Sequence, residues 1–102
     1  MSKEIKHTEE SRELVLSAIN DYAVYTRAIM PAIRCLKKFK AGTFDADKAV
    51  KQFYHVATYA AKVYAREFCD NATPYYKVFS TADRRAAAAD LLDYYMEDIT
   101  EE

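Results

Sequence analysis

Few residues in this 102-residue chain have the types and spacing that chemistry requires. Of its two histidines, His7 lies in a polar N-terminal segment and His55 lies among cations, and neither has a Cys, Ser or carboxylate at helical spacing to form a nucleophile–base pair. H-x-x-x-H, C-x-x-C and D-x-D-x-D-G motifs are absent, and a single glycine excludes a Gly-rich phosphate loop. The sequence therefore predicts a protein that is not an enzyme and holds no metal or cofactor.

A cationic stripe is the most distinctive surface that the sequence predicts. At about 100° per residue, one face of a helix over residues 46–70 collects Lys48, Lys51, His55, Thr58, Lys62 and Arg66. Such a stripe can follow a phosphate backbone while Tyr59 stacks on a base, but 15 Lys and Arg against 16 Asp and Glu leave no net positive field. A solvated face and a protein contact are the alternatives, and nucleic acid is the least favoured of the three.

Tyrosines extend this surface. The five-residue spacing of Tyr54, Tyr59 and Tyr64 turns each ring by about 140° from the last, so the helix must be surrounded on several sides. Tyr64 is predicted in the core and the other two on its flanks. The candidate interaction surface is Lys48, Lys51, Tyr54, His55, Tyr59, Lys62, Arg66, Tyr75 and Tyr76. Because aromatic residues are 14% of the chain and tyrosine is favoured at interfaces, a homo-oligomer is expected, most simply a two-fold dimer, with a monomer as the alternative.

The elements that position these residues are helices with few interruptions. In the first helical region an apolar seam recurs three and four residues apart: Val15, Ile19, Tyr22, Thr26, Ile29, Ile33 and Leu36. The seam keeps its register through Pro31, whose ring removes a hydrogen bond to Arg27. This favours one helix kinked at Pro31 over two helices that meet at that residue.

The second helix is predicted over about residues 46–70. Gly42 follows a basic run and marks the preceding helix end, and Asp45 is the predicted N-cap. The predicted core face holds Val50, Phe53, Ala57, Ala60, Ala61, Tyr64 and Phe68.

Two further helical segments complete the chain. Thr73 is predicted to cap a short segment that starts at Pro74 and ends at Phe79. Ser80 then opens a third helix over about 81–99 with Asp83 in a capping box. Its predicted buried face is Ala88, Leu91, Leu92, Tyr95 and Ile99. The acidic residues on its far side are Asp83, Asp90, Asp93, Glu97 and Glu101.

The fold class that follows is mainly α: three principal helices, the first kinked at Pro31, plus a short helical segment in a helical bundle. Residues 1–8 are predicted as a flexible N-terminus and residues 9–102 as a single helical domain. No apolar run approaches the ~20 residues of a membrane span, and no signal-peptide core is present, so a soluble intracellular protein is expected. Cys35 and Cys69 are predicted to be reduced and buried.

Several stretches resemble small proteins encoded by tailed bacteriophages. The resemblance covers about residues 13–99 and rests on the runs 42–51, 60–64 and 67–68. Further matching positions are Asn20, Asp21, Tyr25, Pro31, Ile33 and the run 85–88. Cys69 departs from the pattern, where a glycine is expected.

The resemblance implies a phage accessory protein in the cytoplasm of an infected bacterial host. Small helical proteins of such genomes are commonly inhibitors or adaptors that act by binding. The leading hypothesis is a non-enzymatic protein that binds a host or viral protein and inhibits a host or defence complex. A structural or self-assembling helical protein is the alternative, and a weak nucleic-acid binder is the third reading.

Overall fold

The computed structural model describes residues 8–37, 46–69 and 73–100, and every regular element within these ranges is helical. This confirms the predicted mainly α bundle. The elements are α1 (Glu9–Asn20), α2 (Tyr22–Val24), a π-helical turn η1 (Tyr25–Ile29), α3 (Met30–Lys37), α4 (Ala46–Phe68), α5 (Tyr75–Val78), α6 (Thr81–Tyr94) and α7 (Met96–Thr100). None of the helices in the described part of the chain has the length and apolarity that a membrane crossing requires.

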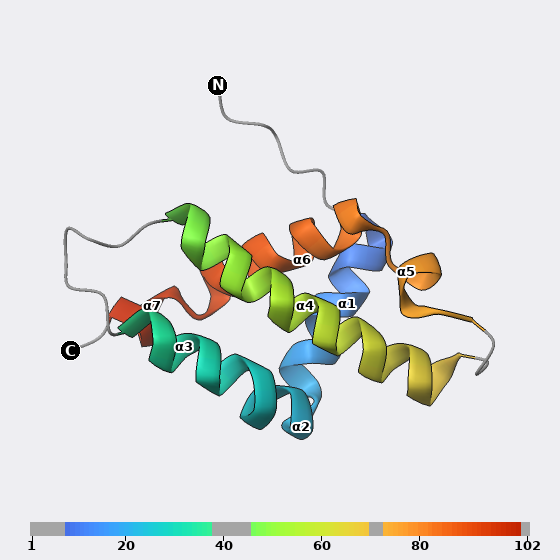
Figure 1. The fold of residues 1–102 in the computed structure, drawn as a ribbon, viewed down its shortest axis with the longest axis horizontal. Helices are drawn as coiled ribbons and strands as arrows, with labels where there is room; N and C mark the ends of the chain where they lie inside the picture. The colour runs from blue at the N-terminus through green and yellow to red at the C-terminus, as the bar shows by residue number, and fades with distance from the viewer. Residues whose placement is uncertain (1–7, 38–45, 70–72, 101–102) are drawn as a thin grey trace.

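The longest helix, α4, is the centre of the bundle. It lies across α1 and α6, with α3 alongside it and α5 near its C-terminal end (Figure 1). Its buried face is rich in alanine, with Ala57, Ala60 and Ala61. The facing helix α6 also buries three alanines: Ala86, Ala87 and Ala88. Small side chains shorten the distance between two packed helices, so the contact between α4 and α6 is the most extensive in the fold.

The first helical region is interrupted at Asp21, ten residues before the proline. Asp21 has extended backbone angles (φ −97°, ψ 114°), and its carboxylate accepts hydrogen bonds from the N–H groups of Ala23 and Val24. The predicted single helix is therefore wrong at this residue, because a side-chain cap replaces the helical hydrogen bonds there.

The backbone is helical through Pro31, as predicted. The π-helical turn stands directly before it, and the Met30 N–H bonds to the Tyr25 carbonyl five residues back. A π-turn widens the helix where proline cannot donate. The break at Asp21 shifts the register of the seam, so Tyr22 is 81% exposed and Val24 is buried instead.

The predicted cores of the later helices are largely confirmed. All five residues predicted on the buried face of the third helix are buried, although the helix is interrupted at Tyr95. In α4, Phe53 is buried, Val50 and Tyr64 are half-buried, and Phe68 is 68% exposed, so its assignment to the core is wrong. The C-terminal end of α4 extends beyond α1 (Figure 1), which leaves Phe68 uncovered.

The caps of the short segments follow local chemistry. Ser80 and Asp83 form the predicted capping box. Pro74 is the N-cap of α5, with no side-chain cap from Thr73, one residue from the prediction. The predictions for Gly42, Asp45, Glu101 and residues 1–7 lie outside the described residues, while Thr8 is the N-cap of α1.

The predicted acidic side of the third helix is only partly exposed. Asp93 and Glu97 are exposed, but Asp83 and Asp90 are half-buried. Both cysteines are half-buried, so the prediction that they belong to the core is wrong.

Asp83→Asn is expected to reduce the pH dependence of stability in acid. Burial by itself would raise the pKa of Asp83, but hydrogen bonds from Thr8 and Ser80 outweigh it and leave the pKa below the usual 3.8. A carboxyl with a lowered folded-state pKa stabilises fully above its unfolded pKa, and the stabilisation is lost as the pH falls through the folded value. Urea unfolding at about pH 6 and about pH 3 measures the effect. The difference in free energy of unfolding between wild type and variant should be smaller at the lower pH. An equal difference at both pH values would contradict a lowered pKa of Asp83 in the folded protein.

Candidate functional site

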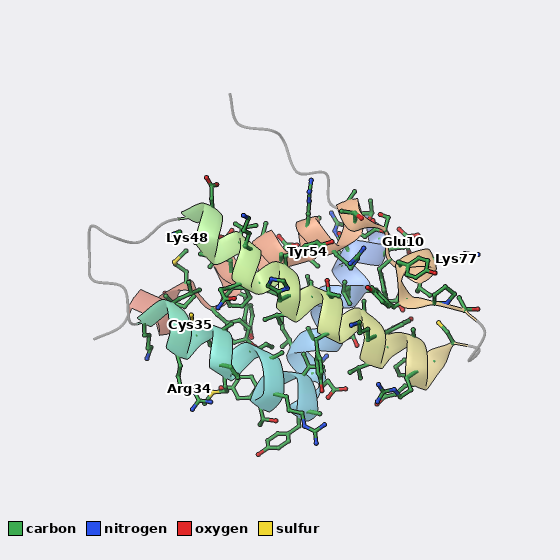
Figure 2. The ribbon with its side chains drawn as sticks, in the orientation of Figure 1. Glu10, Arg34, Cys35, Lys48, Tyr54 and Lys77 are labelled. Atoms are coloured by element: carbon green, nitrogen blue, oxygen red, sulfur yellow. The ribbon has the colours of Figure 1, made fainter. Side chains whose placement is uncertain are left out.

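The cationic stripe forms on α4 as predicted. Lys48, Lys51, His55, Lys62 and Arg66 are exposed, and Tyr54 and Tyr59 pack on the core from the flanks. Lys48 lies near the start of α4 and Tyr54 farther along it (Figure 2). The stripe spans about 27 Å of helix, at 1.5 Å per residue, so it is a long face and no single pocket.

A buried arginine that the sequence does not single out organises the middle of this face. Arg84 of α6 is 8% exposed, and its guanidinium carbon lies 5.3 Å from the ring centre of Tyr54 and 5.2 Å from that of Tyr75. Its terminal nitrogens donate hydrogen bonds to the hydroxyls of Thr58 (3.2 Å) and Thr81 (3.3 Å). Its Nε is buried and has no acceptor among the described residues.

This cluster uses several of the residues predicted to meet a partner. The Lys62 Nζ lies 5.3 Å from the ring centre of Tyr75, and Tyr76 contacts Tyr75 edge-on at 5.5 Å. Cation–π contacts and hydrogen bonds thus join α4, α5 and α6 around Arg84. Tyr54 and Tyr75 act here as internal packing residues, and only Tyr76 keeps a largely exposed ring (57%).

A groove between α1 and the C-terminal half of α4 is the feature that sequence reasoning missed. Its volume is about 340 Å³, and its lining is Glu13, Leu16, Ser17, Asn20, Asp21, Tyr64, Glu67 and Phe68. Leu16 is 60% exposed and Phe68 is 68% exposed, so two large apolar side chains face solvent in one hollow. We call this hollow the acidic groove, because its charged residues are all carboxylates.

Tyr64 joins the floor of the acidic groove to the core. Its ring lies 5.0 Å from Phe68 and 5.1 Å from the buried Phe79. Its hydroxyl donates a hydrogen bond to Glu13 Oε1 (2.5 Å), and this bond, with burial, raises the pKa of Tyr64 to about 12. The phenol therefore stays neutral at physiological pH and holds the Glu13 carboxylate at the rim.

A second groove, of about 280 Å³, lies between α4 and the segment formed by η1 and α3. It is lined by Arg27, Ala28, Pro31, Ala32, Gln52, His55, Val56 and Tyr59. The lining joins His55 and Tyr59 of the predicted surface with Arg27, and it contains no carboxylate or thiol that could pair with the imidazole. This lining lacks the geometry of a nucleophile–base pair.

The described residues contain no group of three or more His, Cys, Asp or Glu side chains that could hold a metal ion. No family model, curated protein or solved structure matches the chain. Among the described residues, the acidic groove combines two exposed apolar side chains with three carboxylates, and the proposal below starts from it.

Proposed function

We propose that the chain is a non-enzymatic protein-binding module and that the acidic groove binds a basic amphipathic helix of its partner. A single observation carries the proposal: Leu16 and Phe68 are both exposed in one hollow whose lining also includes Glu13, Asp21 and Glu67. Exposed apolar clusters on a small protein mark contact sites.

Helix-in-groove recognition fits the shape and charge of this site. A hollow between two helices accepts the apolar stripe of a third helix, and its anchors are apolar side chains three or four residues apart. Lys or Arg beside those anchors would face the three rim carboxylates, which favours association and sets orientation. Because Phe68 packs against the ring of Tyr64, it offers an aromatic anchor, and such anchors dominate binding energy.

The biological setting follows from the resemblance to phage-encoded proteins. We place the chain among accessory proteins made in the cytoplasm of an infected bacterium, where it would block a host or defence complex by covering a basic helical segment of one subunit. Inhibition of this kind requires only that the site is occupied, and it involves no chemical step.

Binding is tested by truncating the two anchors. Leu16→Ala combined with Phe68→Ala is expected to weaken partner binding by about 100-fold or more, because each truncation removes a central apolar contact. Tyr94→Ala is the matched control, since Tyr94 is 60% exposed but lies outside the groove. Partners captured from host lysate by wild type and control, and lost with the double variant, are then mapped to a peptide.

The captured peptide must be basic and helical when bound, and its affinity must fall as salt rises. Equal capture by wild type and the double variant would reject the groove as the binding site. A peptide without positive charge would reject the proposed partner chemistry.

A further inference from the structure

From the acidic groove we infer a specific occupant: a second copy of this chain, which inserts the exposed ridge of its η1–α3 segment and so forms a two-fold dimer. The α3 ridge is defined by Arg27, Met30, Arg34 and Lys37, all of which are exposed. Arg34 points away from α4 on the outer side of α3 (Figure 2). The inference rests on the proposed function, because it concerns the same groove: the second copy occupies the groove when no partner protein is bound.

Exposed apolar side chains gather at the groove and the ridge. Six large hydrophobic residues are exposed in the described part of the chain: Leu16, Tyr22, Met30, Phe68, Tyr76 and Tyr94. Leu16 and Phe68 line the groove, Met30 lies in the ridge, and Tyr22 lies between the two along the chain. Four of the six therefore belong to the groove or to the segment that follows it along the chain, and exposed apolar residues gathered in this way are expected of an interface.

The charges of the two surfaces are complementary. The groove carries three carboxylates and no Lys or Arg in its lining. The exposed side chains from residue 22 to residue 37 include three cations and no carboxylate: Tyr22, Arg27, Met30, Pro31, Arg34 and Lys37. Met30 lies between cations, so its flexible apolar side chain can reach Leu16 and Phe68 while Arg27 and Arg34 meet the rim.

The order of the elements along the chain permits a two-fold dimer. Asp21 lines the groove and Arg27 begins the ridge six positions later, a distance of about 9 Å along a helix. In Figure 1, α2 joins the end of α1, which supplies one wall of the groove, to the segment that carries the ridge. A two-fold axis near Tyr22 places the ridge of each copy in the groove of the other and makes the same contact twice. Ridges of side chains three and four residues apart pack naturally between two helices.

Groove and ridge each present few exposed side chains, so we expect a small interface and reversible association. An interface below about 1,200 Å² in total is typical of transient complexes, and we expect a dissociation constant of about 1–100 μM. A partner helix that binds the groove must displace the ridge of the second copy. Partner binding is therefore expected to convert dimer to monomer.

Charge reversal with mixing tests the assignment. The groove variant carries Glu13→Lys and Glu67→Lys, and the ridge variant carries Arg27→Glu and Arg34→Glu. Each variant alone should dimerise at least about tenfold more weakly than wild type, because both contacts then oppose like charges. A one-to-one mixture should recover dimer to within about threefold of wild type, because both contacts of the mixed pair regain opposite charges. Sedimentation equilibrium gives the mass, and circular dichroism verifies that each variant is folded.

The matched control carries Lys51→Glu and Arg66→Glu, which makes the same charge change as the ridge variant but on the cationic stripe. It should dimerise like wild type. A wild-type chain that stays monomeric at about 500 μM, about five times the upper limit of the expected range, would overturn the inference. So would a mixture that stays monomeric, or a control as weak as the ridge variant.

These outcomes are separable from those of the proposed function. A monomer that still captures a basic helix through Leu16 and Phe68 overturns only the dimer. If mixing restores the dimer but no partner is captured, the proposed binding of a basic partner helix is rejected, and the chain is a self-assembling helical protein.

Discussion

Phe53→Ala is expected to lower the free energy of unfolding by about 3–5 kcal/mol, the largest effect of any single truncation proposed for this chain. The Phe53 side chain is fully buried on α4, and its ring stacks at 6.3 Å on that of Tyr95 at the end of α6. Removing the ring leaves a cavity between two helices whose other contacts are mostly alanine, and alanine side chains cannot move to fill it.

Phe68→Ala is the matched control, because it is the same substitution on the same helix. Phe68 is 68% exposed, so the expected change in stability is within about 0.5 kcal/mol. Urea unfolding followed by circular dichroism measures both variants. Phe68→Ala should instead weaken dimerisation and partner binding. Similar destabilisation by the two substitutions would show that Phe68 is part of the core and would remove the acidic groove as a binding site.

Arg84→Ala is expected to lower the free energy of unfolding by about 2–4 kcal/mol. The substitution removes two charge-assisted hydrogen bonds, to Thr58 and Thr81, and two cation–π contacts, to Tyr54 and Tyr75. It also removes the aliphatic stem, which packs between the helices. Relief of the cost of burying a charge offsets part of this loss, which is why the expected value is below the sum of the contacts.

Arg85→Ala is the control for this prediction, because Arg85 is the next residue of α6 and is exposed. Its effect should be within about 0.5 kcal/mol. Arg84→Lys should restore little of the lost stability. A single ammonium group cannot replace a planar guanidinium that bonds two hydroxyls and contacts two rings. A destabilisation from Arg84→Ala no greater than that from Arg85→Ala would mean that the cluster contributes no net stability and would contradict the prediction.

These two pairs of variants separate folding from binding. Phe53 and Arg84 hold α4 to α6 and α5, whereas Phe68 and the rim of the acidic groove contribute little to folding. A protein of this size can tolerate few losses of several kcal/mol, since the total stability of a small domain is about 5–15 kcal/mol. If the groove binds a partner as proposed, sequence changes at its exposed residues are expected to alter partner choice without unfolding the chain.

Local chemistry decided what the sequence predicted well. The Ser80 and Asp83 capping box depends on residues three apart, and it formed as expected. The buried face of the third helix depends only on helical periodicity, and Leu91, Tyr95 and Ile99 are buried as predicted. The cationic stripe on α4 follows from the same periodicity. In each case the information lies within one helix.

The tertiary structure alone decided the rest. Phe68 has the periodicity of a core residue, but burial needs a neighbouring helix, and α4 extends beyond α1 at that point. Arg84 lies in an unremarkable run of arginine and alanine, and only packing brings the rings of Tyr54 and Tyr75 within cation–π distance of its guanidinium. The acidic groove joins α1 to α4, whose lining residues are some fifty positions apart, as the bond from Tyr64 to Glu13 shows. Periodicity fixes which side of a helix is apolar, whereas the length and crossing of its neighbours fix how much of that side is covered.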